Sequence, residues 1–403
     1  MKEEQIHENE QAAAPVTSRA TVLLGVTGTV DSAIVQPCLQ EIGPVLNARV
    51  IVAAPNLAEA TENDVHFRSY PLTAGRPENL PWVNASFAQR AICSLAAEVQ
   101  ADVCVLLHGD LILLNADVLP LFIQPVLEKR CDVVLPVYAA GKFDGLLNHG
   151  ILAPLARALF GQRVRYPLPL DFSCSAEMCA KFTAPHPAHD PNADEILWPA
   201  TIAAVAGKQV CQVNVDASHG RQTDGIELRT ALASLVGSAF IEMEKYASFW
   251  QRIRGSRATP VTGHAVKQAS ESDGIDVKPL IDSFLLGARN LQEIWGPVLP
   301  PVTLFELKRL SRAPLEEFRM PDELWVRILY DFALAHRLRS ISRSHLLGAL
   351  TPLYLGWVAS YVQEAANLSP FAAEQRLEQL ARAYEENKPY LLRRWRWPDR
   401  FNP

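Results

Sequence analysis

The sequence of 403 residues contains no long apolar run, no closely spaced cysteine pair, no basic excess and no internal repeat. No stretch approaches the ~20 apolar residues that span a bilayer, so we expect no membrane span. The seven cysteines include no Cys-x-x-Cys pair, which argues against both a zinc site and a disulfide framework. The net charge of −6 argues against nucleic-acid binding, which needs a basic face.

What the sequence does contain is typical of a globular enzyme, with 49% hydrophobic and 20% charged residues. Residues 1–18 are polar and rich in Ala and Glu, without an apolar core. We therefore expect a disordered tail there, rather than a signal peptide or membrane anchor. These features together predict a cytoplasmic protein.

Apolar runs and amphipathic segments alternate from residue 20 onward, which predicts a mostly parallel, doubly wound α/β sheet. The predicted strands are Ala20–Thr27, Arg49–Ala54, Asp102–Leu107, Asp132–Val137 and Val210–Val215. The predicted helices are Asp31–Leu46, 87–99, Asp117–Lys129, Glu195–Ala206 and Glu227–Arg254. Residues 55–81 are predicted to be a loop with one edge strand.

The pattern changes near residue 255, where a Ser-, Gly- and Thr-rich stretch begins. We predict an α/β domain over 19–255, a linker or mobile loop over 256–276, and a helical unit over 277–403. The helical unit includes predicted helices at Asp322–Leu338, His345–Ala366 and Pro370–Tyr390.

Several short segments follow one another in a characteristic order. The strand Val103–Leu107 runs into His108-Gly109-Asp110, and the next strand is followed by Lys142-Phe143-Asp144-Gly145. Later come Arg163-Val164-Arg165, Asp171-Phe172-Ser173 and Ser218-His219-Gly220. This order resembles the retaining glycosyltransferases of the GT-A fold, specifically the glucosylglycerate- and mannosylglycerate-synthase-like group (family 2-like).

The resemblance implies a metal site at the ends of two strands. The family pattern carries an Asp-x-Asp and a distal histidine, which here correspond to His108-x-Asp110 and His219. Asp110 and His219 would be the direct ligands of Mg²⁺ or Mn²⁺, and His108 replaces the first acid. Read locally, Asp110 is equally a helix cap or turn residue, His219 a surface-loop histidine, and His108 a histidine satisfied beneath a loop.

The resemblance also covers an acceptor loop, Arg165–Phe172, in which Asp171 retains the family's carboxylate beside the reacting sugar. That carboxylate suits a hydrogen bond to a sugar hydroxyl and electrostatic support of an oxocarbenium-like centre. The alternative is that Asp171 caps a helix over Ser173–Lys181. Two family glycines are replaced by Pro169 and Leu170, and a threonine by Leu146, so the acceptor is expected to differ.

The turn after the first strand resembles the segment that contacts the nucleotide base and ribose in this group. By that resemblance Gly25, Thr27, His108 and Asp110 would bind the nucleotide sugar. The segment lacks the further glycine and lysine of dinucleotide and P-loop motifs, and a plain strand-to-helix turn also explains it. We expect Leu350–Gly356 to serve helix packing, and Arg393–Trp397 to be a docked C-terminal tail.

The resemblance implies an enzyme that moves a hexose from a nucleotide-sugar donor to a small-molecule acceptor, as in glucosylglycerate synthesis. Two other readings stay open: a degenerate relative that binds nucleotide sugar without efficient transfer, and an unrelated doubly wound binding protein. A homodimer is left open by the sequence.

Overall fold

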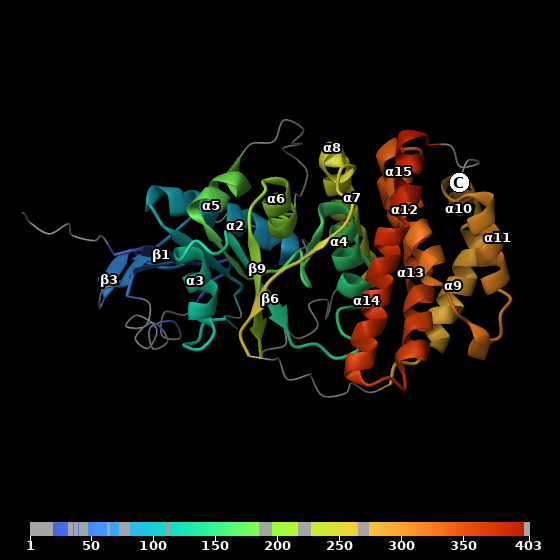
Figure 1. The fold of residues 1–403 in the computed structure, drawn as a ribbon, viewed down its shortest axis with the longest axis horizontal. Helices are drawn as coiled ribbons and strands as arrows, with labels where there is room; N and C mark the ends of the chain where they lie inside the picture. The colour runs from blue at the N-terminus through green and yellow to red at the C-terminus, as the bar shows by residue number, and fades with distance from the viewer. Residues whose placement is uncertain are drawn as a thin grey trace, which may run out of the picture.

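A computed structural model describes residues 19–30, 35, 39, 47–62, 65–71, 81–109, 111, 113–184, 196–216, 227–264 and 274–398. Figure 1 shows a sheet with its flanking helices at one end and a large group of helices at the other. The predicted α/β fold class, a doubly wound sheet followed by a helical unit, is confirmed.

The central sheet has nine strands in the order β11-β9-β6-β8-β5-β1-β2-β4-β3. They are β1 (Thr21–Val26), β2 (Arg49–Ala53), β3 (Ala60–Glu62), β4 (Val65–Arg68), β5 (Val103–Leu107), β6 (Val133–Tyr138), β8 (Phe172–Ser175), β9 (Val210–Val215) and β11 (Val261–Thr262). β3 and β8 run antiparallel to their neighbours, and the other pairings are parallel. Two short strands, β7 (Gln162–Arg163) and β10 (Arg257–Ala258), pair separately.

Successive strand residues face opposite sides of the sheet, and each side is covered by helices. On one side Val22, Leu24 and Val105 pack with α3 (Leu119–Leu127). On the other side Leu23 and Leu106 pack against α2 (Pro81–Glu98), α5 (Ala176–Thr183) and α6 (Pro199–Val205). Strands buried on both faces explain the continuous apolar runs in the sequence.

Several sequence expectations needed correction. The predicted helices Glu227–Arg254 and Pro370–Tyr390 are each interrupted, at Tyr246 and at Asn387. Residues 55–71 form two strands, β3 and β4, where one edge strand was predicted. The residues after Asp171 form β8 before a helix begins, so the predicted helix start at Ser173 was wrong. Ser175 is the N-cap of α5, accepting a hydrogen bond from the Met178 amide, which excludes Asp171 as that cap. Of the predicted helix Asp31–Leu46, only residues 35 and 39 lie among those described, both helical and buried.

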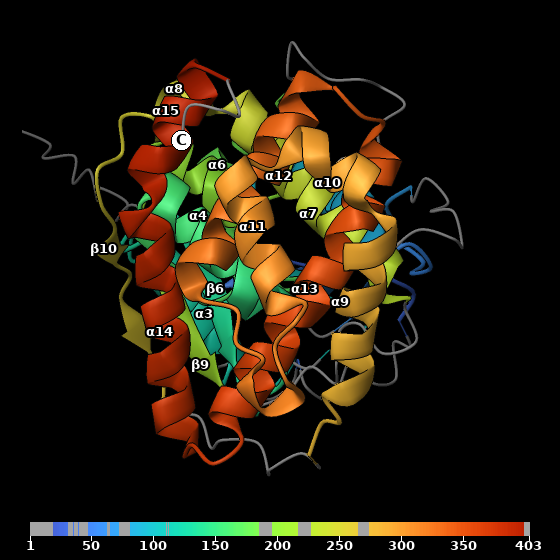
Figure 2. The same ribbon diagram turned by 90° about the vertical axis from the view of Figure 1, so that its right-hand side faces the viewer.

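The described part of residues 278–396 is built from helices packed side by side (Figure 2). They are α9 (Lys278–Asn290), α10 (Gln292–Val298), α11 (Pro301–Leu310), the short 3-10 helix η2 (Leu315–Glu317), α12 (Asp322–Leu338), α13 (Arg343–Ala365), α14 (Pro370–Glu386) and α15 (Lys388–Arg396). The largest apolar cluster joins them to α4 (Ala153–Phe160), α7 (Leu228–Lys245) and α8 (Ala247–Trp250). The domain boundaries at 255 and 277 stay a prediction. None of the described helices is long and apolar enough to cross a membrane.

Gly150 contacts three aromatic residues of the C-terminal helices. It lies in a π-helical turn, Asn148–Leu152, labelled η1. Its carbonyl accepts hydrogen bonds from Trp325 Nε1 at 3.1 Å and from the Tyr384 hydroxyl at 2.8 Å. A Cβ at this position would lie 2.3 Å from the Trp357 ring, so no larger residue fits without displacing that indole.

The C-terminal segment is docked, as expected. Arg394 is buried and donates a 2.9 Å hydrogen bond from Nε to Asp331, which also accepts from the Tyr390 hydroxyl at 2.8 Å. Trp395 is buried against Trp250, whereas Trp397 is exposed. Leu350, within α13, is also buried, in agreement with a packing role for that stretch.

Candidate functional site

The centre of the sheet contains a topological switch point between β1 and β5. From β1 the chain passes to β2 on one side, and it later returns to β5 on the other side. In open α/β sheets, ligands bind outside the carboxyl ends of the strands at such a point. The ends of the two strands are joined here, because the Thr27 amide donates a 2.8 Å hydrogen bond to the Leu107 carbonyl.

Two glycines follow these strand ends and keep them free of side chains. A Cβ built on Gly28 would lie 3.7 Å from the Cα of Gly109, so the two turns face each other closely. Thr27 and His108, predicted to contact the nucleotide, lie next to these glycines and are partly accessible. The structure therefore brings Thr27 and His108 together at the carboxyl ends of two central strands.

Gly25 has a structural role that the sequence did not reveal. It lies inside β1, and a Cβ at this position would approach the Ile92 side chain of α2 to 2.2 Å. The glycine therefore lets α2 pack closely on the sheet. Its predicted contact with a nucleotide stays a prediction.

The loop after β1 is held by the neighbouring strand's loop. Val30 and Asn56 exchange two hydrogen bonds, from the Val30 amide to Asn56 Oδ1 at 3.0 Å and from Asn56 Nδ2 to the Val30 carbonyl at 2.8 Å. The buried Tyr70 hydroxyl donates to the Val26 carbonyl at 2.6 Å. These contacts fix the backbone on one side of the switch point.

Asp171 connects three strands near the switch point. Its side chain is fully buried, at 0% exposure, immediately before β8. Oδ1 accepts a 2.6 Å hydrogen bond from the His108 amide, just beyond β5. Oδ2 accepts a 3.0 Å hydrogen bond from the hydroxyl of Tyr138, the last residue of β6. The carboxylate is thus fixed by donors from both neighbouring strands.

An aromatic cluster extends from Tyr138 away from Asp171. Tyr166 packs edge-to-face on Tyr138 and on His149, with ring-centre separations of 5.3 and 5.6 Å. Burial, assisted by the nearby Arg165 charge, lowers the pKa of His149 to about 3. Burial also raises the pKa of the Tyr166 hydroxyl. His149 is therefore neutral at physiological pH and acts here as an aromatic neighbour, not as a cation.

The loop between Arg163 and Asp171 is held by buried amide side chains. Gln212 of β9 accepts from the Arg165 amide at 2.7 Å and donates to the Arg163 carbonyl at 3.3 Å. Gln89 of α2 donates to the Leu170 carbonyl at 3.1 Å. Because Gln212 and Gln89 are each about 2% exposed, these hydrogen bonds face little competition from water.

The helical unit contacts the same region from the opposite direction. Lys142 donates from Nζ to the Ala366 carbonyl at 2.9 Å, and its own carbonyl accepts from the Tyr361 hydroxyl at 2.9 Å. Arg165 forms an ion pair with Glu374 of α14. The helices of the C-terminal unit therefore position the segment predicted to bind the acceptor.

Pro169 and Leu170 stand where the sequence resemblance predicts glycines. Pro169 and Leu170 are both buried, and Leu170 belongs to the apolar cluster shared with the helical unit. Leu146, which replaces the family threonine, belongs to the same cluster. Leu146 and Leu170 thus stabilise the core in addition to any effect on an acceptor.

Asp110 and His219 lie outside the described residues. Asp110 follows the end of β5 by three residues, and His219 follows the end of β9 by four. β5 and β9 point the same way, since β8 is antiparallel to β5 and β6, and β9 is parallel to β6. Their ends are three strand spacings apart, about 14 Å, and three or four extended residues span about 10–13 Å.

Tyr138, Tyr166 and His149 were not singled out as site residues from the sequence. The sequence could have indicated Tyr138, because it is a polar residue at the carboxyl end of a strand that adjoins the predicted site. No sequence pattern indicated Tyr166 or His149, since only the folded chain brings η1 beside the acceptor loop.

A scan against protein-family models and a search of curated proteins find no match. Among solved structures, the chain is similar to glucosyl-3-phosphoglycerate synthase from Mycobacterium tuberculosis. Its complex with Mn²⁺, UDP-glucose and phosphoglyceric acid is 16% identical with a TM-score of 0.36, over 57% of this chain and 80% of that chain. The complex with Mg²⁺ and UDP is 14% identical with a TM-score of 0.34, over 56% and 79%. The complex with phosphoglyceric acid alone gives 16% and 0.36, over 60% and 88%.

Proposed function

We propose that this protein is a GT-A-type, metal-dependent retaining glycosyltransferase that moves a hexose from a nucleotide sugar to a small acceptor. The observation that carries the proposal is the position of Asp171. This fully buried carboxylate is hydrogen-bonded to the amide of His108 at the end of β5, beside the switch point of the sheet. By the sequence resemblance, this same carboxylate would lie beside the reacting sugar.

The donor would bind outside the carboxyl ends of β1 and β5. Gly28 and Gly109 leave the backbone there open to close approach by a ligand. Thr27 and His108 would contact the nucleotide, in agreement with their place at the strand ends. Asp110 and His219 would hold Mg²⁺ or Mn²⁺, because the distance between β5 and β9 is within reach of their loops. The cation, when bound, supplies positive charge to the leaving diphosphate.

Asp171 would act by its charge. Both of its oxygens accept hydrogen bonds, from His108 and Tyr138, and its side chain has no exposed surface. A carboxylate fixed in this way is pre-organised to stabilise a positively charged, oxocarbenium-like centre at the end of β5. The same constraints disfavour a role as an attacking nucleophile, which would need to leave both donors.

The residues of the predicted acceptor loop favour an acceptor other than glycerate. Proline at 169 restricts the backbone where the family has glycine, and Leu170 is part of the core. We therefore expect weak glycerate transfer by the natural sequence, with donor hydrolysis or another small acceptor preferred. A protein that binds donor without efficient transfer is the second candidate, favoured by these same two residues.

The test is a donor screen by isothermal titration calorimetry with UDP-, GDP- and ADP-sugars, each with Mn²⁺, with Mg²⁺ and with EDTA. We expect one base to bind only when a cation is present. Product analysis by NMR with the preferred donor then separates the two candidates, since an enzyme releases an α-configured product and a binding protein releases none. Absence of cation-dependent binding with every donor would refute both.

A further inference from the structure

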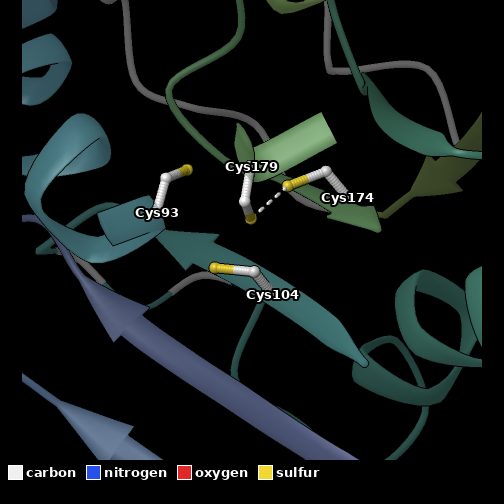
Figure 3. Close-up of side chains that lie close together, drawn as sticks. All are labelled: Cys93, Cys104, Cys174 and Cys179. Atoms are coloured by element: carbon white, nitrogen blue, oxygen red, sulfur yellow. Dashed lines mark hydrogen bonds between the residues drawn. The ribbon is translucent and has the colours of Figure 1, made fainter. Parts of the chain in front are cut away.

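Four cysteines that are far apart in the sequence meet in the core of the α/β sheet. Cys93 lies on α2, Cys104 on β5, Cys174 on β8 and Cys179 on α5 (Figure 3). All four sulfur atoms lie within 4.8 Å of one another. The absence of a Cys-x-x-Cys pair, from which no zinc site was expected, therefore does not exclude one, because the fold brings distant cysteines together.

We propose that Cys93, Cys104, Cys174 and Cys179 form a structural tetrathiolate site for a zinc ion. Zinc–sulfur bonds are about 2.3 Å, so the edges of a tetrahedral ZnS₄ centre are about 3.8 Å. The Cys174 and Cys179 sulfurs are already 3.5 Å apart, and no pair exceeds 4.8 Å. Four sulfurs around one point therefore need only small shifts to surround an ion.

The elements that carry the ligands are rigid and mutually fixed. Cys104 and Cys174 are directly paired in the antiparallel ladder between β5 and β8. Cys93 and Cys179 come from two helices that pack on the same face of that ladder. Ligands on strands and helices hold a metal geometry more precisely than ligands on loops.

Burial and charge are compatible with a closed, structural centre. The four cysteines are at most 2% exposed, which leaves no room for the open coordination position of a catalytic zinc. Thiolate sulfur also selects zinc over the hard cations Mg²⁺ and Mn²⁺ expected at the strand ends. The N-terminal end of α5, between Cys174 and Cys179, offers a positive dipole to the negative thiolates.

The site would reinforce the ladder that supports the candidate active site. Cys104 lies on β5 four residues before His108, and Cys174 lies on β8 three residues after Asp171. A metal that joins these two strands would therefore bind only a few residues along each strand from the hydrogen bond between Asp171 and His108. The metal would affect Asp171 and His108 only by fixing the positions of the two strands next to them.

The test is the metal content of the full chain, purified from zinc-supplemented culture, desalted and measured by mass spectrometry. We expect about one zinc per chain, released when a mercurial reagent modifies the thiols. The double variant Cys104→Ser/Cys174→Ser should lose the zinc. The matched control is Cys131→Ser/Cys211→Ser, a second neighbouring pair of thiols outside the cluster, and it should retain the zinc.

A spectroscopic measurement on the unmodified chain guards against variants that fail to fold. Protein produced with Co²⁺ should show thiolate-to-cobalt charge transfer and the intense visible bands of tetrahedral cobalt. Three results would overturn the proposal: a folded, metal-free chain with all thiols titratable after denaturation; a disulfide within the cluster; or zinc that persists in the folded Cys104→Ser/Cys174→Ser variant.

Discussion

The carboxylate of Asp171 accepts a hydrogen bond from the backbone amide of His108, 63 residues earlier in the chain. This contact joins the predicted sugar-binding loop to the predicted nucleotide-binding turn through one buried group. The alternative role of Asp171 as a helix cap does not apply, because Ser175 is the N-cap of α5.

Replacing Asp171 with Asn should separate catalysis from binding. The amide keeps the size of the side chain but removes the negative charge, so we expect hexose transfer to fall by about 100-fold or more. Nucleotide affinity, measured by calorimetry, should change by less than about threefold, since the charge acts mainly in the transition state. Tyr138→Phe is the comparison variant, because it keeps the charge of Asp171 but removes one hydrogen bond that fixes it, so transfer should fall less than in Asp171→Asn. A loss of nucleotide affinity in proportion to activity would contradict this assignment.

The metal site is tested by comparing Asp110→Ala with His108→Ala. Asp110 is the predicted ligand, so its removal should abolish cation-dependent nucleotide binding in a calorimetric titration. His108 lies beside the ligand, and its removal should weaken that binding by about tenfold. Negligible effects from both changes would show that no cation is held at the end of β5.

The acceptor loop can be tested at Pro169 without disturbing the core. Pro169→Gly should raise activity on glycerate, because it introduces a freely rotating backbone where the glycosyltransferases that the sequence resembles have glycine. Leu170→Gly should instead destabilise the protein by about 3–5 kcal/mol, since Leu170 is part of the main apolar cluster. Thermal unfolding and steady-state kinetics on both variants distinguish the two effects. A folded Pro169→Gly variant with unchanged glycerate transfer would argue against backbone stiffness as the obstacle.

His336 should make the stability of the protein depend on acid pH. Burial, with the charges of Arg343 and Arg339, lowers the pKa of His336 to about 4, and its Nδ1 is buried without a hydrogen-bond partner. Between pH 6.5 and about 4 the unfolded chain binds a proton that the folded chain does not, so this group lowers stability as pH falls. Asp331 acts in the opposite direction, because burial raises its pKa to about 6 and its contribution is lost as pH rises through that value.

The variant His336→Phe isolates the histidine, since a phenyl ring can keep the edge-to-face contact with Phe240. Denaturant unfolding at several pH values should show that the stability difference between variant and wild type is flat above pH 7. It should then move in favour of the variant as pH falls toward 4. A difference that does not change with pH would show that His336 is protonated as easily in the folded chain as in the unfolded one.

The buried ion pair of Asp331 and Arg394 provides a test of the docked C-terminal helix. Asp331→Ala leaves the Arg394 guanidinium buried without its carboxylate, so we expect a loss of about 3–5 kcal/mol in chemical denaturation. The double change Asp331→Leu/Arg394→Met should recover most of that loss, because no charge is left unpaired. A single change that costs less than the double change would contradict the inference.

The sheet was readable from the sequence because its strands carry continuous apolar runs. β1, β2, β5, β6 and β9 were each located to within about a residue or two at either end, and α12 was predicted with its observed bounds. β8 was missed because it is only four residues long and runs directly into the helix α5, although its residues Phe-Ser-Cys-Ser alternate apolar and polar as in a strand. Inserted antiparallel between β5 and β6, β8 is defined by partners 39 to 72 residues away, not by its own pattern.

The candidate site was predictable only in part for the same reason. Residues at strand ends, such as His108, could be placed from the strand boundaries alone. Tyr166, and the four cysteines of the core cluster, meet only through tertiary contacts. A spacing rule for cysteines detects ligands on one hairpin or helix, and it does not detect ligands that are shared among a sheet and two helices.

The absent side chain of Gly150 has a consequence for how this molecule unfolds. The carbonyl of that residue holds Trp325 and Tyr384 at once, so moving the helices away from the sheet breaks both hydrogen bonds in a single event. We therefore expect one calorimetric transition and no stable fragment ending near residue 277. Amide exchange in α12 and α14 should therefore become slower when a ligand binds at the ends of β1 and β5, because a ligand that stabilises the whole fold protects both helices.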